Sequence, residues 1–382
     1  MQTDGSRALS RAERLDWLRL SRSENVGPIT FRQLLARYGS AGEALAALPE
    51  LARRGGRTRP IRICDRAEAE AELEALDKLD ARLIALCEPE YPTALAALED
   101  APPLIACLGH VHLLERPAVG VVGARNASAN GRRLARQMAA ELAAAGLLVV
   151  SGLARGIDAA AHEGALENGT AAVVAGGFDV VYPEENAELQ EQIARQGAIL
   201  SEMPAGTVPQ ARHFPRRNRL ISGMSRGVVV VEAAPRSGSL ITARFALDQG
   251  REVFAVPGSP LDPRARGCNN LIRQGALLVE SAADVLEALE STPSRPTAEP
   301  KAPEFLAGAA PEPDRAEVER VLDRVKGLLG PDPVPVDELI RQCQVSPALV
   351  QTALLELELA GRAERHPGNR VALIAGCRAA ER

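Results

Sequence analysis

The chain has 382 residues, a formal net charge of −5 at pH 7 and a sequence pI near 5.8. This length predicts two or three domains of about 150 residues each, and the overall acidity excludes a uniformly basic surface for nucleic acid. The polar N-terminus is unlike a signal peptide and no apolar run approaches the roughly 18 residues of a membrane span, so we expect a cytoplasmic chain without membrane contact.

The first hundred residues are predicted to form a helical domain, because apolar residues recur there at helical spacing. The expected helices are Arg11–Ser21, Thr30–Tyr38, Ala41–Ala47 and Arg66–Leu79. Segment 24–38, which turns at Gly27-Pro28, is similar to a helix-hairpin-helix or SAM-type hairpin, whose backbone N–H groups can meet a DNA phosphate. A packed accessory bundle is the favoured alternative, because a single hairpin is a weak electrostatic site.

Residues 101–290 are predicted to form an α/β domain with a Rossmann-like, doubly wound parallel sheet. After Ala101-Pro102-Pro103, short β-branched runs alternate with helix-length segments. The expected strands are 118–122, 147–150, 171–175, 198–200, 228–231, 252–256 and 276–279. Ligands of such sheets lie beyond the strand C-termini.

Glycine turns and arginines follow several of these strands. The turns are Gly123-Ala124-Arg125-Asn126, Ser151-Gly152-Leu153-Ala154-Arg155-Gly156, Ala175-Gly176-Gly177 and Arg236-Ser237-Gly238-Ser239. Each offers N–H groups at a helix start, where an anion is favoured. A cationic block, Arg212 to Arg219, lies between two strands, and segment 210–273 holds eleven arginines against four acidic residues. The positive charge is therefore concentrated where a phosphodiester could bind.

Aromatic residues make up only 3% of the chain, so binding must depend mainly on phosphates. Phe214, with Phe178 and Tyr182, could still stack a base, although Phe214 could instead be a loop anchor. His213 is expected to be at most a weak phosphate contact, and His162 to make a structural hydrogen bond.

The C-terminal part is predicted to be a winged helix, residues 313–382, joined by a proline-rich linker at 291–312. A helix over Asp337–Cys343 precedes a second helix, capped by Ser346-Pro347, that ends at Leu359, and the hairpin strands are 362–365 and 371–374. Segment 313–382 holds ten basic and eleven acidic residues, and the second helix has no Lys or Arg. A protein contact or a structural role is therefore favoured over duplex DNA.

Several kinds of enzyme chemistry are excluded because the sequence lacks the residues that they require. The only lysines are Lys78, Lys301 and Lys326, so the central domain has neither a Walker A lysine nor a Schiff-base lysine. The first turn lacks a full GxGxxG and no acidic residue follows the second strand, which argues against a nicotinamide cofactor. The six cysteines include no CxxC pair. We expect no catalytic residue, no metal and no cofactor.

Four motifs occur in one order and at domain-scale spacing. They are Ser151-Gly152-Leu153-Ala154-Arg155-Gly156-Ile157-Asp158 with Ala161-His162, Phe214-Pro215-Arg216-Arg217-Asn218-Arg219, Ser237-Gly238-Ser239-Leu240-Ile241-Thr242-Ala243, and Ala255-Val256-Pro257-Gly258. From about Glu88 to Glu290 the chain resembles the DNA-processing protein A family, also called Smf, whose members are bacterial recombination mediators. Ala124 departs from the family pattern, which usually has a hydroxyl residue before the arginine retained here as Arg125.

The resemblance implies a binding protein rather than an enzyme. Such a protein would protect incoming single-stranded DNA during natural transformation, in competent cells, and help to load the RecA recombinase while displacing single-strand-binding protein. It would also form a homodimer. The residues expected to contact DNA are Gly123, Arg125, Gly152, Arg155, Gly156, Phe214, Arg216, Arg217, Asn218, Arg219, Ser237, Gly238 and Ser239.

Two other classes of function remain as alternatives. Doubly wound domains with such turns also occur in nucleotide phosphoribohydrolases similar to the lysine-decarboxylase-like family, for which Glu232 is the one candidate carboxylate, although their usual Pro-Gly-Gly-x-Gly-Thr turn is missing. A small-molecule sensor that acts through the winged helix would need a basic C-terminal domain, which this chain lacks.

Overall fold

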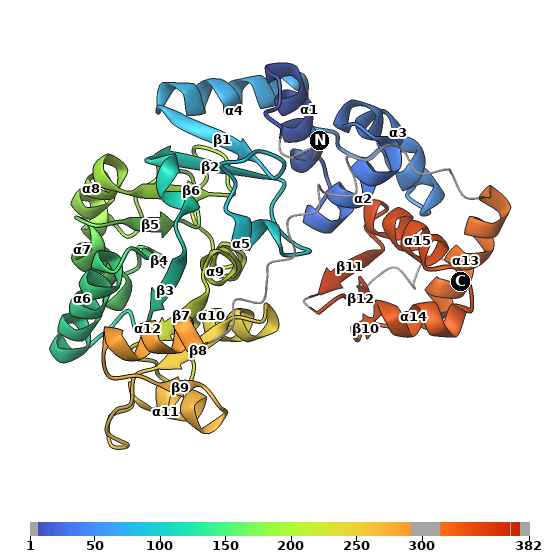
Figure 1. Ribbon diagram of the computed structural model, residues 1–382. Coiled ribbons are helices and arrows are strands. Elements are labelled where there is room, and N and C mark those ends of the chain that lie inside the picture. The colour runs from blue at the N-terminus through green and yellow to red at the C-terminus, as the bar shows by residue number, and fades with distance from the viewer. Residues whose placement is uncertain (1–6, 292–313, 367, 375–382) are drawn as a thin grey trace, which may run out of the picture. The chain divides into compact units, whose positions relative to one another are not determined.

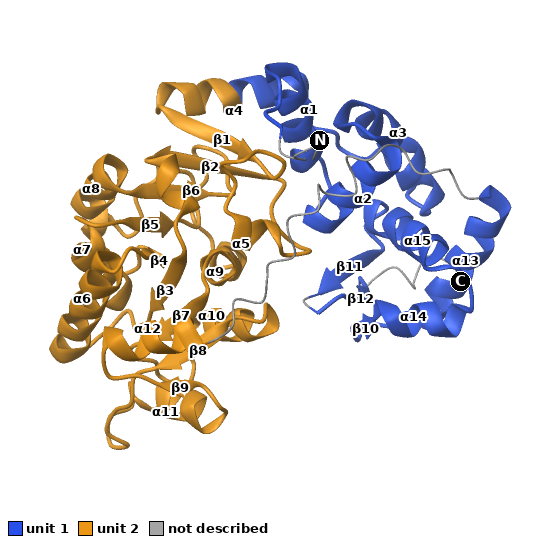
Figure 2. Cartoon of the chain, in the orientation of Figure 1, with its two compact units in different colours: residues 1–71, 301–382 blue, residues 72–300 orange. Residues whose placement is uncertain are grey.

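The structure is a computed structural model, and it describes residues 7–291, 314–366 and 368–374. Two compact units, coloured in Figure 2, divide the chain: one combines Met1–Ala71 with Lys301–Arg382, and the other is Glu72–Pro300. The predicted linker at 291–312 lies outside the described residues except for Ser291. The predicted N-terminal and C-terminal domains thus fall into a single unit, and the sheet domain is inserted between its two segments.

The inserted unit is built on a nine-stranded sheet with the order β1-β2-β6-β5-β4-β3-β7-β8-β9 (Figure 1). Its strands are β1 Ala81–Ala85, β2 Leu104–Gly109, β3 Ala118–Val122, β4 Leu148–Ser151, β5 Thr170–Val173, β6 Ala198–Ser201, β7 Gly227–Val230, β8 Glu252–Ala255 and β9 Leu277–Leu278. Strands β3 to β9 pair in parallel, which confirms the predicted doubly wound sheet. The chain order reverses around β3, between β4 and β7, at the switch point where this fold binds ligands.

Two antiparallel strands that were not predicted extend the sheet, and β1 lies outside the predicted domain of 101–290. β2 pairs with β6, and β1 pairs with β2. The prolines at 102 and 103, from which a boundary was predicted, lead into β2 instead, and the Pro103 carbonyl accepts a hydrogen bond from the Leu86 N–H. The sheet unit therefore begins near Glu72 rather than at residue 101.

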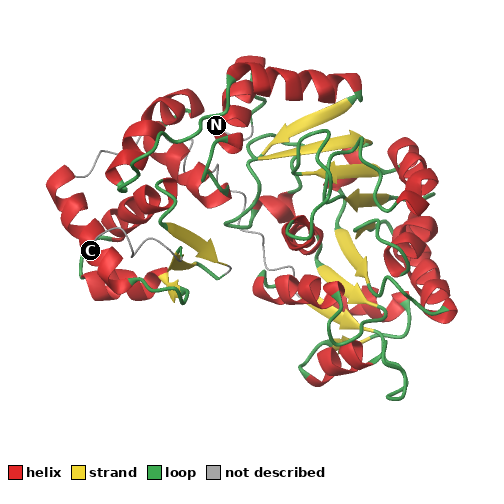
Figure 3. Cartoon of the chain, turned by 180° about the vertical axis from the view of Figure 1, so that it is seen from behind, coloured by secondary structure: helices red, strands yellow, loops and turns green. Residues whose placement is uncertain are grey.

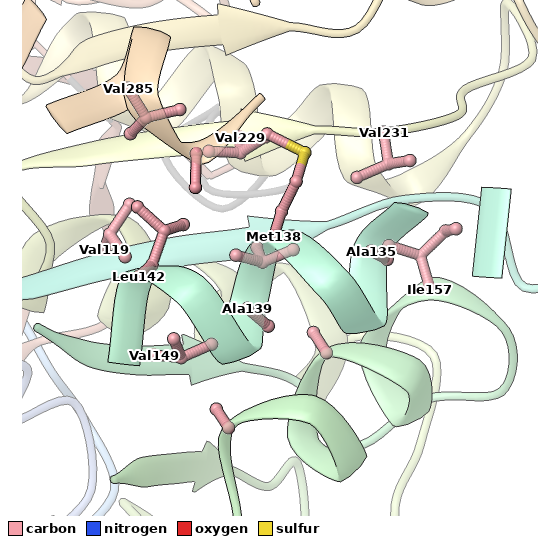
Figure 4. Close-up of a cluster of buried hydrophobic side chains, with 14 of the residues drawn as sticks. Val119, Ala135, Met138, Ala139, Leu142, Val149, Ile157, Val229, Val231 and Val285 are labelled. Atoms are coloured by element: carbon pink, nitrogen blue, oxygen red, sulfur yellow. The ribbon is translucent and has the colours of Figure 1, made fainter. Parts of the chain in front are cut away.

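Helices cover both faces of the sheet (Figure 3). They are α5 Thr93–Ala96, α6 Ala129–Ala144, α7 Ile157–Ala165, α8 Ala187–Gln196, α9 His213–Met224, α10 Gly238–Asp248, α11 Arg266–Arg273 and α12 Ala282–Ser291, with 3-10 turns at Val111–Glu115 and Glu184–Asn186. Val119 of β3 lies in a buried cluster with Met138 and Leu142 of α6 (Figure 4). The next residue, Gly120, faces Ile221 of α9, because successive residues of a strand point to opposite faces. Helices α6 and α9 therefore lie on opposite faces.

The second unit contains the N-terminal helices and the winged helix. The elements are α1 Arg11–Arg22, α2 Pro28–Tyr38, α3 Ala41–Arg54, α13 Arg315–Leu328, α14 Val336–Cys343, α15 Pro347–Leu359 and the strands β10 Val334–Pro335, β11 Ala363–His366 and β12 Arg370–Leu373, while α4 Arg66–Lys78 contains the division between the units. The predicted helices and hairpin are present, although α3 continues to Arg54 rather than ending at Ala47. The predicted Ser346 cap is confirmed, since its hydroxyl accepts from the Leu349 N–H at 3.4 Å. Helix α13 and strand β10 were not predicted.

Three features of the described ranges bear on function. None of their helices combines the length and the hydrophobicity needed to cross a membrane. The five cysteines in these ranges are buried and form no disulfide, and Cys377 lies outside them. Among the same residues, no cluster of His, Cys, Asp and Glu is arranged to hold a metal ion.

Candidate nucleic-acid interface

The turns after β3 and β4 pack against each other at the C-terminal edge of the sheet. The Ile157 N–H donates to the Ala124 carbonyl at 3.2 Å. Gly156 has a φ of 80°, and a Cβ there would lie only 2.3 Å from the Ala124 carbonyl oxygen and 2.6 Å from that of Arg125. Glycine is needed at Gly156 for both reasons. The strand order thus brings two of the predicted glycine turns into one surface.

The cationic block forms the start of helix α9, not an extended loop, because α9 begins at His213. A helix turns about 100° per residue, so consecutive arginines point in different directions. Arg212 and Arg216 are exposed, whereas Arg217 and Arg219 keep only 6% and 8% of their surface exposed. The four arginines of the block therefore have different surroundings and different roles.

Arg217 is a buried cation that lines a pocket at the strand C-termini. Its Nη1 lies over the Gly152 backbone, where an added Cβ would be 1.3 Å away. The pocket is also lined by Gly152, Ala154, Tyr182 and Phe214. Burial lowers the pKa of Arg217 to about 10, with Asp158 opposing the shift, so the guanidinium stays charged at neutral pH. Within the described ranges, no hydrogen bond or ion pair is made by this guanidinium, and its Nε is fully enclosed.

Asp158 lies in the same buried region and supports the turn after β4. Its carboxylate accepts from the Ala154 N–H at 3.4 Å. Burial raises the pKa of Asp158, while the nearby Arg217 charge and the backbone N–H groups of Ala154, Gly123 and Gly152 lower it. Asp158 therefore fixes the turn and favours the charged form of Arg217.

Arg219 and Asn218 do not face a ligand. Arg219 donates from Nη2 to both oxygens of Glu202 at 2.8 Å, and from Nη1 to the Asp100 carbonyl at 2.6 Å. The Asn218 amide donates to the Gly238 carbonyl at 3.4 Å. Both residues were expected to contact DNA, but their polar groups are held within the protein because the helix turns them inward. Glu202 has no obvious signal in the sequence that would reveal its role.

Arg125, Phe214 and Tyr182 lie in contact beside the pocket, with the two rings inclined at 55° to each other. The Arg125 guanidinium lies 5.1 Å from the centre of the Phe214 ring, and the rings of Phe214 and Tyr182 are 5.7 Å apart. Arg125 is exposed and Tyr182 is 48% exposed, so a flat ligand group could reach these side chains. Phe178 was expected to help to stack a base, but it is only 5% exposed, so this prediction is wrong.

The remaining predicted residues lie in turns at helix starts. Arg155 is exposed and forms an ion pair with the equally exposed Glu185. Ser237 caps α10 by accepting from the Ser239 N–H at 3.4 Å, and the two hydroxyls lie 2.7 Å apart. Gly238 is exposed, and a Cβ there would meet no atom within 4 Å. This turn is open to a ligand at Gly238 but partly satisfied by its own serines.

Two histidines near the site are structural. His162 is fully buried, and its Nδ1 lies 2.7 Å from the Thr170 hydroxyl, which itself donates to the Val149 carbonyl at 2.9 Å. This confirms the predicted structural hydrogen bond. His213 is 7% exposed, and its Nδ1 accepts from the Gln210 N–H at 3.3 Å. Burial and the nearby arginines Arg212 and Arg216 lower the pKa of His213, so it is not a cationic phosphate contact at neutral pH.

A second pocket, which no sequence motif suggested, lies farther along the same edge of the sheet. It has a volume of about 560 Å³ and is lined by Pro235, Leu240, Pro260, Arg266, Gly267, Asn269, Asn270 and Arg273. Pro235 follows β7 and Pro260 follows β8, so this pocket is also at the strand C-termini. Positive side chains therefore continue from β4 past β7 and β8.

Comparison with known proteins covers all three parts of the chain. Residues 82–290 match the family described as DNA recombination-mediator protein A, residues 11–75 match a DprA-like N-terminal HHH domain, and residues 309–369 match a DprA winged helix domain. The chain is 41% identical over 315 residues to Protein Smf of Escherichia coli, which covers 82% of this chain and 83% of that protein. It is 48% identical over 202 residues to DNA processing protein DprA of Streptococcus pneumoniae, covering 52% and 71% of the two chains.

Two solved structures are similar as well. The X-ray structure of DNA processing protein A from Streptococcus pneumoniae has a TM-score of 0.61 and 37% identity, and the match covers 73% of this chain and 98% of that one. A structure of DNA processing protein A from Helicobacter pylori, described for its single-stranded DNA binding mode, has a TM-score of 0.51 and 30% identity, covering 56% and 96%.

Proposed function

The chain belongs to the DNA recombination-mediator protein A family, and from this membership we propose that it binds single-stranded DNA at the C-terminal edge of its sheet. The observation that carries the proposal is Arg217. A charged side chain that is buried without a hydrogen bond or an ion pair costs several kcal/mol unless a ligand compensates it. Asp158 compensates part of this cost, because its charge favours the charged form of Arg217, and we infer that an anionic ligand at the pocket that Arg217 lines supplies the rest.

Phosphate is the anion that the surroundings fit. The turn from Gly152 to Gly156 leads into α7, whose positive N-terminal end adds to the charge of Arg217. A guanidinium can donate two parallel hydrogen bonds to phosphate oxygens. We therefore assign the deepest phosphate contact to Arg217 and the N–H groups of this turn, and more superficial contacts to Arg125, Arg155 and Arg216.

A single strand fits this edge better than a duplex does. The exposed Tyr182 ring, which packs against Phe214 at an interplanar angle of 55°, offers a surface for an unpaired base, and paired bases would be hidden from it. The other contacts are to phosphates, which carry no base information. We therefore propose binding with little sequence preference. The basic pocket with Arg266 and Arg273 would extend the proposed phosphate-binding surface beyond β7.

The biological role follows from the family. We propose that the protein acts in the cytoplasm as a recombination mediator rather than as an enzyme, that it protects incoming single strands in natural transformation, and that it helps RecA to replace single-strand-binding protein. A homodimer is also part of the proposal. It is supported by the edge strand β9, where Leu277 and Leu278 are 43% and 51% exposed, since an apolar sheet edge is suited to pairing with a second copy.

The test is a titration of labelled single-stranded and duplex oligonucleotides by fluorescence anisotropy. Arg217→Ala should weaken single-strand binding by at least tenfold, about 1.4 kcal/mol. Arg195→Ala is the matched control: Arg195 lies in the last turn of α8, just before β6 begins and hence at the N-terminal ends of the strands, and its side chain is 74% exposed. Circular dichroism would show that both variants are folded. Unchanged affinity in a folded Arg217→Ala variant would contradict the proposal.

A further inference from the structure

Helix α15 of the winged helix is buried on more than one side. Its residues from Ala353 to Leu359 are all buried. Leu354 and Leu357 lie in the core of the winged helix, with Val321 of α13 and Val371 of β12. A helix that is buried all round has a second partner beyond its own domain core. Here that partner is the N-terminal helical segment, with α2 and α3 beside α15 (Figure 1).

Polar side chains join the two segments at defined points. The Thr30 hydroxyl of α2 donates to Glu358 Oε2 at 2.8 Å, and Gln33 Nε2 donates to Gln351 Oε1 at 2.8 Å. From the wing, Arg365 donates to Glu358 Oε1 at 2.7 Å and to Gln351 Oε1 at 3.1 Å. The buried polar groups of α15 thus obtain their partners from both sides.

The backbones also approach closely at the end of α3. Gly55 leaves no room for a side chain, because a Cβ there would lie 1.9 Å from the Glu356 carbonyl oxygen and 2.8 Å from the Cβ of Ala360. Next to it, Arg362 donates to the Gly56 carbonyl at 2.9 Å. The fit between α3 and the end of α15 is therefore specific.

The charge of α15 is unsuited to DNA. The helix has no Lys or Arg, and its two carboxylates, Glu356 and Glu358, are 3% and 6% exposed. The nearest cation of the wing, Arg365, is engaged by Glu358. An exposed α15 would present two carboxylates to the phosphates of a duplex, which would repel it.

We propose that α15 is a protein-docking helix, that its partner is the α2–α3 segment of the same chain, and that it does not bind duplex DNA. The winged helix is thereby held on the N-terminal helices through the helix that such a domain would otherwise place in a major groove. Its role is to join the two ends of the chain, independently of single-strand binding by the inserted unit.

The test uses the full chain with a site for a sequence-specific protease placed in segment 292–313. After cleavage, the C-terminal fragment should still elute with the rest of the chain in size-exclusion chromatography. In the Gly55→Ala variant, the C-terminal fragment should dissociate from the rest of the chain at least tenfold more readily. This substitution suits the local backbone, since Gly55 has a φ of −66°, so that the added Cβ acts only against α15. Gly42→Ala in the same helix is the control, because the nearest atom to its Cβ is 3.4 Å away.

A second variant and a second measurement complete the test. Thr30→Val keeps the shape of the side chain and removes the hydrogen bond to Glu358, and it should increase release about tenfold. Gly55→Ala should bind a duplex oligonucleotide no better than the unmodified chain. A wild-type fragment that separates after cleavage, or a tenfold gain of duplex affinity in Gly55→Ala, would overturn the proposal.

Discussion

The carboxylate of Glu232 is joined to Ser128 by two hydrogen bonds, one from the Ser128 hydroxyl at 2.6 Å and one from its backbone N–H at 2.9 Å. Ser128 in turn caps α6 by accepting from the Gly131 N–H at 2.9 Å. Glu232 follows β7, so this pair ties the turn after β7 to the start of α6. Both carboxylate oxygens are thus engaged in fixing a helix start, which is a structural role for the one candidate catalytic carboxylate.

We therefore predict that the protein releases no free base from nucleoside monophosphates, as measured by chromatography. Glu232→Gln should instead destabilise the inserted unit by about 1–2 kcal/mol, because it weakens a charge-assisted cap. Arg264→Lys, which keeps the positive charge near Glu232 and does not touch the Ser128 contacts, is the control. Turnover that disappears in Glu232→Gln would support the phosphoribohydrolase alternative.

Gly152→Ala should abolish most single-strand binding. The added Cβ would displace the Arg217 guanidinium, whose Nη1 lies 1.3 Å from the Cβ position. We expect a loss of more than tenfold in anisotropy titrations. Gly327→Ala, where nothing lies within 4 Å of the added Cβ, should have no effect. Equal affinity of the two variants would show that Arg217 does not contact DNA.

The salt dependence of single-strand affinity should show how many phosphates the protein neutralises. If several phosphates are neutralised, log affinity for a single strand should fall linearly with log salt by about 0.7 per phosphate. Arg125→Ala and Arg216→Ala should each flatten that slope by about one contact, since both residues are exposed at the site. Arg219→Ala should leave the slope unchanged, because Glu202 already holds this residue. If neither Arg125→Ala nor Arg216→Ala changes the slope, the DNA binds at another surface of the protein.

Tyr182→Ala should weaken binding by roughly 1–3 kcal/mol, the usual value of one stacked base. Tyr182→Phe keeps the ring and should bind like the unmodified chain. The slope of log affinity against log salt should stay the same in both variants, because stacking releases no counterions. If the alanine variant binds normally, the ring does not stack a base.

The unit around His162 should lose stability as the pH falls. Burial, followed by the Arg217 charge, lowers the pKa of His162 from 6.5 to about 3. Between these values the unfolded chain binds a proton that the native state does not bind, so stability rises with pH in this window. The loss from pH 7.5 to 5 is about 2 kcal/mol. Asp158 opposes this trend, because burial raises its pKa.

His162→Asn should reduce this loss, since Asn retains a donor toward Thr170 but does not titrate. Amide hydrogen exchange of β4 at the two pH values, corrected for the intrinsic rates, would measure the difference. The same pH dependence in both proteins would indicate that another group is responsible.

The strands and the ligand end of the sheet could be predicted because their signals are local. Runs such as 118–122 and 228–231 are short and β-branched, and glycine turns follow them. The antiparallel strands β1 and β2 were missed, since β1 directly follows a helical pattern and the two prolines before β2 resemble a boundary. Strand β2 also pairs with β6, with Ala106 opposite Ser201, and no local pattern reveals a pairing between segments so far apart in the sequence.

The different surroundings of the arginines could not be predicted without knowing which face of α9 points into the protein. In the sequence Arg216, Arg217 and Arg219 form one cationic block, and only the helical rotation separates an exposed residue from a pocket residue and an ion-paired one. The contact of Glu358 with Thr30 is even harder to predict from the sequence, because it joins two parts of the chain that lie at opposite ends of the sequence.

The insertion of the sheet unit has a consequence for the order of events during synthesis. Residues 72–300 separate the two segments of the other unit. At about 5–20 residues per second, the ribosome needs roughly 10–50 s to make that stretch, which is ample time for the sheet unit to fold as a domain. Helices α1 to α3 leave the ribosome first, yet they complete their packing last, when α15 arrives.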